Sequence, residues 1–264
     1  MNLKIAKLAG DGIGPEVITE AVKVCNAVAK KFNHKITWND GLIGADAIDK
    51  VGDPYPQKTH EICLESDAIL FGAIGDPKYD NNPNAKIRPE QGLLSMRKKL
   101  GLYANIRPTF TFDSLIENSP LKKEIIRGTN LIFVRELTGG IYFGKKGRNN
   151  KNMSAYDTCN YSKDEIVRLA KIGFNLASKR SKKLCCVDKA NVMETSRLWR
   201  ETIQSMEKDY PKIEVSYEFV DAVAMRLIQW PKNYDVLITE NLFGDILTDE
   251  ASVISGSMGL MPSA

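Results

Sequence analysis

The sequence predicts an α/β protein in which buried strands alternate with amphipathic helices. Short apolar runs that end at glycine or at charged residues recur along the chain, as in strands covered on both faces. Longer segments between them repeat apolar residues every three or four positions, as on the buried side of a helix. With 43% hydrophobic and 27% charged residues over 264 positions, the chain can bury one large core or two ordinary ones.

The first elements are a strand, a tight loop and a helix. Residues 3–9 alternate as a strand, and the loop at residues 10–16 leads into a helix that opens at Pro15, a favourable first-turn position. The run at residues 68–74, closed by Gly75, is typical of a strand buried on both faces. The apolar residues of the helix have the spacing of a single buried face: Val17, Ile18, Ala21, Val22, Cys25, Val28, Ala29 and Phe32.

Later strands are predicted over residues 130–137, 183–188, 214–220 and 234–239. Ser162 and Glu165 fit a capping box at the start of another helix. Residues 138–161 are polar and rich in glycine, asparagine and lysine, so we predict an excursion from the core. This excursion is either a flexible loop or an arm that pairs with another subunit. The helix after Ser162 is predicted to turn these residues inward: Ile166, Ala170, Gly173, Phe174 and Ala177.

Composition excludes several classes of protein. The net charge of +4 is small and the 37 basic residues are spread along the chain, which argues against a nucleic-acid surface. No apolar run approaches the roughly 18 residues of a membrane helix, and the first residues resemble a strand, not an export signal. Five cysteines without a Cys-x-x-Cys pair favour reduced thiols and a cytoplasmic location. With only two histidines, the chemistry is expected to use Asp, Lys, Arg and Tyr.

Asp245 and Asp249 stand four residues apart just after the strand predicted at 234–239, so both carboxylates lie on one face of a helix start. Like charges at that spacing repel and favour a positive partner, for which a divalent cation with oxygen ligands is one candidate. The alternative is an acidic first turn that faces water and complements the helix dipole. Asp221, at another strand-to-helix junction, supplies a third carboxylate.

A second pattern suits an anionic ligand with an apolar branch. Glu90, Leu93, Leu94 and Arg97 share one helix face, although an amphipathic helix with an exposed ion pair has the same pattern. Arginine binds carboxylates in a bidentate way. Because two further arginines stand where apolar runs stop, we expect a substrate with more than one carboxylate. These are Arg107 and Arg135.

Two residues are candidates for proton transfer. Tyr142 lies in a glycine-rich segment and can act as a general acid near a cation, although a tyrosine there is more often packed. Lys189 directly follows a buried strand, where desolvation lowers a lysine pKa; a lysine that extends from a strand end into water is the alternative. The Gly-x-Gly-x-Gly-Pro loop at residues 10–16 differs from the dinucleotide fingerprint, so we predict a plain strand-to-helix turn.

In this order, the motifs at residues 10–16, 86–97 and 241–249 resemble the β-decarboxylating dehydrogenases of 2-hydroxy acids, which include isocitrate, isopropylmalate, tartrate and homoisocitrate dehydrogenases. Within the family, Leu93 and Leu94 make the chain similar to the isopropylmalate enzymes of leucine biosynthesis, because leucine side chains suit an isopropyl group and not an extra carboxylate. A tartrate or homoisocitrate enzyme, or a non-catalytic subunit, is the alternative.

The resemblance implies roles for these residues. Arg97, Arg107 and Arg135 would hold substrate carboxylates, with Leu93 and Leu94 at the branch. Asp221, Asp245 and Asp249 would bind Mg²⁺ or Mn²⁺ together with substrate oxygens. Lys189 would help remove the hydroxyl proton, and Tyr142 would help protonate the enolate that is left after carbon dioxide departs. NAD would meet Pro77, Lys78, Tyr79, Asp80, Ile87, Glu90 and Asn191.

The resemblance also implies a two-domain fold of mixed sheets flanked by helices, and a homodimer with shared active sites. The first domain would contain residues 1–103 and 256–264, and the second residues 104–255 with a dimer arm near 138–161. Family members continue beyond the position of Ala264 with an adenosine-binding segment. We therefore expect the first domain to be incomplete, as in a fragment or a truncated product, and the chain by itself to show no measurable NAD reduction.

Overall fold

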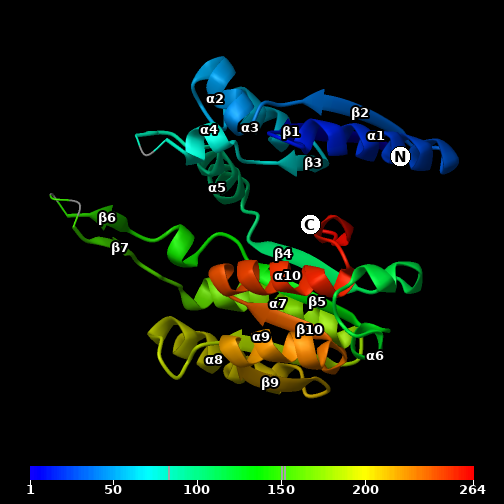
Figure 1. The fold of residues 1–264 in the computed structure, drawn as a ribbon, viewed down its shortest axis with the longest axis vertical. Coiled ribbons are helices and arrows are strands. Elements are labelled where there is room, and N and C mark those ends of the chain that lie inside the picture. The colour runs from blue at the N-terminus through cyan, green and yellow to red at the C-terminus, as the bar shows by residue number, and fades with distance from the viewer. Residues whose placement is uncertain (83, 150, 152) are drawn as a thin grey trace. The chain divides into compact units, whose positions relative to one another are not determined.

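The computed structural model describes residues 1–82, 84–149, 151 and 153–264. It divides into two compact units, Met1–Leu102 and Tyr103–Ala264 (Figure 1). Each unit has its own sheet and its own buried core, and each is described separately below. The predicted α/β class, with mixed sheets flanked by helices, is confirmed.

The first unit is built on a three-stranded parallel sheet in the order β2-β1-β3. The strands are β1 (Asn2–Gly10), β2 (Lys35–Asp40) and β3 (Ala68–Ala73), and the helices are α1 (Gly14–Lys31), α2 (Ala45–Val51), α3 (Gln57–Leu64), α4 (Pro77–Asp80) and α5 (Pro89–Leu100). The loop after β1 is the predicted strand-to-helix turn. Its Asp11 is buried and accepts hydrogen bonds from the backbone N–H groups of Ala45, Asp46 and Gly75, which ties three segments together.

Two expectations for this unit were wrong. Helix α1 does not bury all of its apolar residues, since Val17, Val28 and Phe32 are 47%, 49% and 60% exposed. Only the side that packs on the sheet, with Ile18 and Ala29, is covered. Strand β3 is likewise only partly buried, because it is an edge strand of the three-stranded sheet.

The second unit is built on a five-stranded sheet in the order β4-β5-β10-β8-β9, in which only β4 is antiparallel to its neighbour. Its strands are β4 (Ala104–Phe110), β5 (Asn130–Glu136), β8 (Lys183–Asp188), β9 (Glu214–Phe219) and β10 (Val236–Thr239), and a separate hairpin pairs β6 (Lys146–Arg148) with β7 (Ala155–Asp157). Its helices are α6 (Lys123–Ile126), α7 (Lys163–Ser178), α8 (Glu194–Met206), α9 (Val220–Gln229) and α10 (Asn241–Ser255), with short 3-10 turns η1 (Asp113–Asn118), η2 (Gly140–Tyr142), η3 (Glu207–Asp209), η4 (Pro231–Asn233) and η5 (Met258–Leu260). Because β5, β10, β8 and β9 run parallel, their carboxyl ends meet at one edge of the sheet.

Helices cover both faces of this sheet, which explains the apolar runs of its strands. Alternate residues point to opposite sides: Val134 and Cys186 join α7 and α8 in one core cluster, while Phe133 and Cys185 join α9 and α10 in the other. The predicted capping box begins α7, where the hydroxyl of Ser162 accepts from the backbone N–H of Glu165. The inward residues predicted for α7 are all buried.

The segment predicted as an arm contains η2 and the β6–β7 hairpin, and its residues 150 and 152 lie outside the described part of the chain. The domain assignment predicted for residues 256–264 differs from the observed packing. Here Ala264 exchanges two backbone hydrogen bonds with Ile106 of β4, and the amide of Asn105 donates to the hydroxyl of Ser263, so this tail lies in the second unit. Among the described residues, no helix is both long and apolar enough to cross a membrane.

Candidate active site

The carboxyl edge of the five-stranded sheet gathers several of the candidate residues of the second unit. Arg135 lies near the end of β5, Lys189 follows β8, Asp221 lies in the first turn of α9 after β9, and α10 follows β10 directly. Residues far apart in the sequence therefore meet here because of sheet topology, as is usual for sites in α/β proteins.

The two aspartates of α10 are each matched by an arginine. Asp245 accepts a hydrogen bond from Nη1 of Arg135 at 2.6 Å. Asp249, one turn further on, lies 4.0 Å from Nη2 of Arg107 on β4. Two arginines thus supply positive charge next to the two aspartates. The side chains of Asp245 and Asp249 remain 40% and 56% exposed, so both can also reach a ligand.

Tyr142 meets the same carboxylate. Its hydroxyl donates to Oδ2 of Asp245 at 2.6 Å, while Arg135 occupies Oδ1. The tyrosine is carried by η2, which follows Gly139 and begins at Gly140, a residue with φ of +73°. A Cβ at Gly140 would lie 2.3 Å from the hydroxyl of Tyr161, so this close turn requires glycine.

The two arginines are held differently. Arg135 is 4% exposed and packs on Gly244, where a Cβ would come within 2.5 Å of the arginine Cγ. Arg107 keeps a buried Nε that has no hydrogen-bond partner among the described residues. Burial lowers the pKa of Arg107, against the effect of Asp249, which raises it. An unpartnered buried donor on a cation is a natural position for an anionic ligand group.

Lys189 and Asp221 form a separate pair at the other side of the sheet edge. The ammonium donates to Oδ1 of Asp221 at 2.6 Å and lies 5.6 Å from the ring centroid of Phe219. The hydrogen bond from Lys189 is the main reason that the pKa of Asp221 is lowered. In the described part of the chain, no three His, Cys, Asp or Glu residues come close enough to hold a metal ion. Asp221 therefore does not join Asp245 and Asp249 within one chain.

The residue types nevertheless fit a hard divalent cation. Carboxylate oxygens are the ligands that Mg²⁺ prefers, and Asp245 and Asp249 present two of them from one helix face. A third carboxylate would have to come from outside this cluster.

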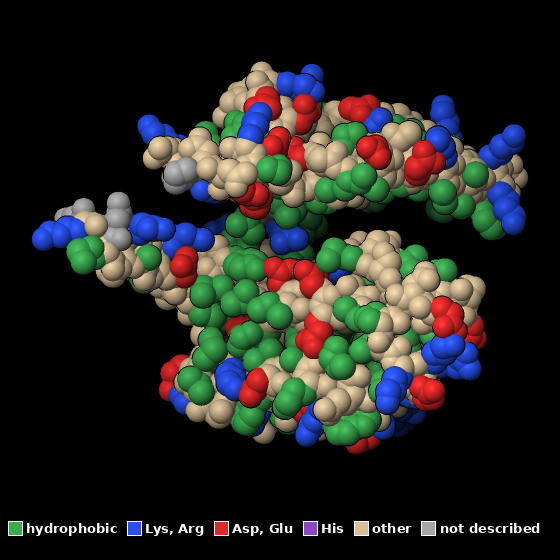
Figure 2. Space-filling view, viewed as in Figure 1, with side chains coloured by type: hydrophobic (Ala, Val, Ile, Leu, Met, Phe, Trp, Pro, Cys, Tyr) green, Lys and Arg blue, Asp and Glu red, His purple; other side chains and the backbone are tan. Residues whose placement is uncertain are grey.

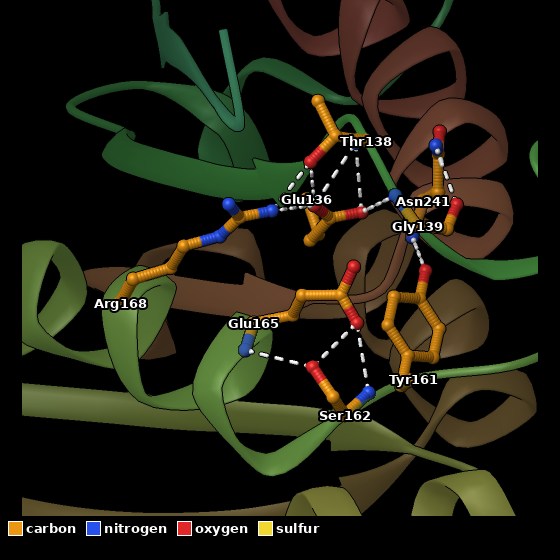
Figure 3. A network of polar contacts seen from close by, with 8 residues as sticks. All are labelled: Glu136, Thr138, Gly139, Tyr161, Ser162, Glu165, Arg168 and Asn241. Atoms are coloured by element: carbon orange, nitrogen blue, oxygen red, sulfur yellow. Dashed lines mark hydrogen bonds and ion pairs between the residues drawn. The ribbon is translucent and has the colours of Figure 1, made fainter. Parts of the chain in front are cut away.

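A buried polar network that sequence reasoning missed joins Glu136 to Thr138, Gly139 and Arg168 (Figure 3). Glu136 is fully buried and accepts from the backbone N–H groups of Thr138 and Gly139 at 2.9 and 2.7 Å. Arg168 of α7 donates to Glu136 and to the hydroxyl of Thr138, at 3.4 and 2.5 Å. A glutamate directly after Arg135, at a strand end before two glycines, was the available signal.

Glu240 was missed as well. It is 4% exposed, and its side-chain partner is the Cys159 thiol, with Sγ 3.7 Å from Oε2. Burial, together with the charge of Asp188, raises the pKa of Glu240 to about 7. Asp188 itself is held by two hydrogen bonds from Arg200, at 2.8 and 2.9 Å.

The remaining candidates lie in the first unit or in loops. On α5, Leu93 packs against the core of the first unit, Leu94 and Arg97 are half-buried, and Glu90 is exposed. Among the predicted cofactor residues, Lys78 and the hydroxyl of Tyr79 bind Asp49. The other cofactor candidates lie at or near the surface: Pro77, Asp80, Ile87 and Asn191. Residue 83, in the same predicted loop, is outside the described residues.

Comparison with known proteins gives concordant results. The sequence profile described as "Isocitrate/isopropylmalate dehydrogenase" matches residues 4–264. The chain is 58% identical over 264 residues to 3-isopropylmalate dehydrogenase of Bacteroides fragilis (strain YCH46), covering 100% of this chain and 74% of the relative. It is 52% identical over 266 residues to the enzyme of the same name from Geobacillus kaustophilus, covering 100% and 71%.

Solved structures agree with these sequence matches. The crystal structure of isocitrate dehydrogenase from Methylococcus capsulatus has a TM-score of 0.87 at 31% identity, over 99% of this chain and 74% of that one. A β-decarboxylating dehydrogenase from Thermococcus kodakarensis has a TM-score of 0.75 at 31% identity, over 99% and 71%. The chain thus spans about three-quarters of the length of these relatives. The profile match over residues 4–264 and the identities to these relatives show that this chain belongs to the isocitrate/isopropylmalate dehydrogenase family.

Proposed function

We propose that this protein oxidises and decarboxylates (2R,3S)-3-isopropylmalate to 4-methyl-2-oxopentanoate and carbon dioxide, with reduction of NAD, as a step in leucine biosynthesis. The observation that carries the proposal is the convergence on α10 of two arginines, a tyrosine hydroxyl and two carboxylates. Relatives that are 58% and 52% identical to this chain over the aligned residues carry the corresponding enzyme name, which favours this substrate over tartrate or homoisocitrate.

The arginines are proposed to bind the substrate carboxylates. Arg107 has a buried unpartnered Nε that can donate to such an oxygen, and Arg135 presents a fixed guanidinium beside it. Arg97 on α5 is proposed as the third, and Leu93 and Leu94 of the same helix as the apolar surface for the isopropyl branch.

The carboxylates of Asp221, Asp245 and Asp249 are proposed to hold Mg²⁺ or Mn²⁺. When bound, the cation acts as a Lewis acid that acidifies the substrate hydroxyl and stabilises negative charge as carbon dioxide leaves. Arg135 then keeps its place at Asp245 and limits where that carboxylate can point.

Lys189 and Tyr142 are proposed to move the protons. Lys189 would accept the hydroxyl proton as hydride leaves the carbon that bears the hydroxyl group. Tyr142 would deliver a proton to the carbon that loses carbon dioxide. Asp245 accepts the hydrogen bond of the Tyr142 hydroxyl at 2.6 Å, which sets the direction of that phenol. NAD supplies the hydride acceptor, and its proposed contacts are Pro77, Lys78, Tyr79, Asp80, Ile87, Glu90 and Asn191.

A homodimer with shared sites is proposed because one chain does not bring its three carboxylates together. In the dimer, Lys189 and Asp221 of one chain would act with Asp245 and Asp249 of its partner. Figure 2 shows hydrophobic side chains gathered on one face of the second unit, over α9 and α10. Met225 and Ile246 on these helices are 59% and 58% exposed, as expected for residues that a second subunit covers.

The test is an assay of the protein expressed from its complete reading frame. NADH formation should require 3-isopropylmalate and a divalent cation, and should be lost on chelation. Asp245→Asn should abolish this activity while leaving the circular dichroism spectrum unchanged, because it removes one anionic ligand without changing side-chain size. Turnover of tartrate or homoisocitrate with a kcat/KM higher than that for 3-isopropylmalate would refute the substrate assignment. Unchanged activity and metal dependence in Asp245→Asn would refute the role of Asp245 as a metal ligand.

A further inference from the structure

Asn241, the first residue of α10, uses every polar group that it has. The side chain is fully buried. Its backbone oxygen accepts from Nε of Arg135 at 2.9 Å, and its side-chain Oδ1 accepts from Nη2 of the same guanidinium at 2.9 Å. Its Nδ2 donates to the carbonyl oxygen of Gly139 at 3.2 Å, and its backbone N–H donates to the hydroxyl of Tyr161 at 2.9 Å (Figure 3).

The chemistry of these partners allows only one orientation of the amide. A guanidinium can only donate hydrogen bonds and a backbone carbonyl can only accept them, so Oδ1 must face Arg135 and Nδ2 must face Gly139. A side chain that only donates or only accepts cannot serve both partners. Asparagine meets this requirement in a fully buried place, because it offers an acceptor and a donor on two separate atoms, Oδ1 and Nδ2.

The two partners of Asn241 lead to the same carboxylate. Arg135 uses its remaining nitrogen, Nη1, to bind Oδ1 of Asp245. Gly139 leads into the turn that carries Tyr142, whose hydroxyl binds Oδ2 of Asp245. Asn241 therefore fixes the separation between the arginine and the tyrosine turn.

We propose that Asn241 is a positioning residue for the dehydrogenase reaction, an inference that rests on the function proposed above. It acts through two residues. By holding two nitrogens of Arg135, it directs the guanidinium to the substrate carboxylate. By holding Gly139, it sets the place of the Tyr142 hydroxyl from which the proton is delivered.

The experiment compares Asn241→Ala with Asn241→Asp. The alanine loses both side-chain bonds, so kcat/KM for 3-isopropylmalate should fall about tenfold or more, as expected for a lost bond to a charged group. The aspartate keeps an acceptor for Arg135, loses the donor for Gly139 and adds a carboxylate charge that faces the Arg135 guanidinium. It should therefore restore the KM for 3-isopropylmalate and the substrate-induced rise in Tm toward wild type, while kcat stays low.

A double-mutant cycle separates positioning from general stability. If Asn241 acts through Arg135, the loss of kcat/KM in the double variant Asn241→Ala with Arg135→Lys should be much smaller than the sum of the losses, in free energy, of the two single variants. Ser255→Ala is the matched control, because Ser255 is also buried on α10 and donates to the Phe110 carbonyl at 3.1 Å. It should lower Tm without changing KM or kcat.

The outcomes distinguish the two proposals. Absence of 3-isopropylmalate turnover in the wild-type protein expressed from its complete reading frame would refute the proposed function itself. With wild-type turnover intact, an unchanged KM and kcat in Asn241→Ala, or fully additive losses in the cycle, would overturn the positioning role alone.

Discussion

Burial makes Glu240 a residue whose charge changes near neutral pH. Its carboxyl ionises near 4.5 in an unfolded chain, and burial raises its pKa in the folded protein to about 7. Between these values the folded state holds a proton that the unfolded state releases. The residue thus contributes most to stability below about pH 4.5, and that contribution is lost as pH rises toward 7.

Glu240→Gln removes this loss because the amide is neutral at every pH. The free energy of unfolding of the variant, relative to wild type, should increase between about pH 5 and 8, by about 1.4 kcal/mol for each unit of pKa shift. Urea titrations at several pH values measure it. Glu201→Gln, an exposed position on α8, is the control. If the difference in the free energy of unfolding between Glu240→Gln and wild type does not vary with pH, the pKa of Glu240 is not raised in the folded protein.

At the scale of one element, two neighbouring leucines of helix α5 differ in their contacts with the core of the first unit. Leu93 packs against the core of the first unit, whereas Leu94 does not belong to that cluster. Leu94→Ala should lower kcat/KM for 3-isopropylmalate roughly tenfold or more relative to malate, which lacks the branch. Leu100→Ala, against the same core, should lower Tm and leave the preference between the two acids unchanged. Equal losses on both acids in Leu94→Ala would show that this leucine does not meet the branch.

The central strands β5, β8 and β10 of the second unit were predictable because they are buried on both faces, so an apolar run identifies them without knowledge of their neighbours. The width of the buried face of α1 was not predictable. The spacing shows which residues of the helix are apolar, but not how many of them the sheet covers. Single charged residues such as Arg135 and Asp245 could be identified from their positions after strands. Their contact could not, since they are 110 positions apart and meet only through the order of the strands. Asn241 was missed for the same reason: its role depends on partners about 100 positions away.

At the scale of the whole molecule, shared sites can be tested by mixing two inactive variants. Lys189→Ala and Asp245→Asn would each disable both sites of a symmetric homodimer. After denaturation and refolding together, hybrid dimers should contain one site with both changes and one with neither, so about a quarter of wild-type activity should return. The pair Asp245→Asn and Asp249→Asn, from the same half-site, is the control and should recover nothing. If the first mixture stays inactive although hybrid dimers are present by mass spectrometry, each site lies within one chain.

The buried thiols of the two cores have a practical consequence. Cys63 lies in the core of the first unit, and Cys185 and Cys186 lie on opposite faces of β8 in the second. Burial raises the pKa of Cys63 and Cys186, and raises that of Cys185 to about 12, so none is reactive while its unit stays closed. The rate of alkylation at Cys63 therefore reports how often the first unit opens, and the rate at Cys185 or Cys186 reports how often the second unit opens. No engineered label is needed.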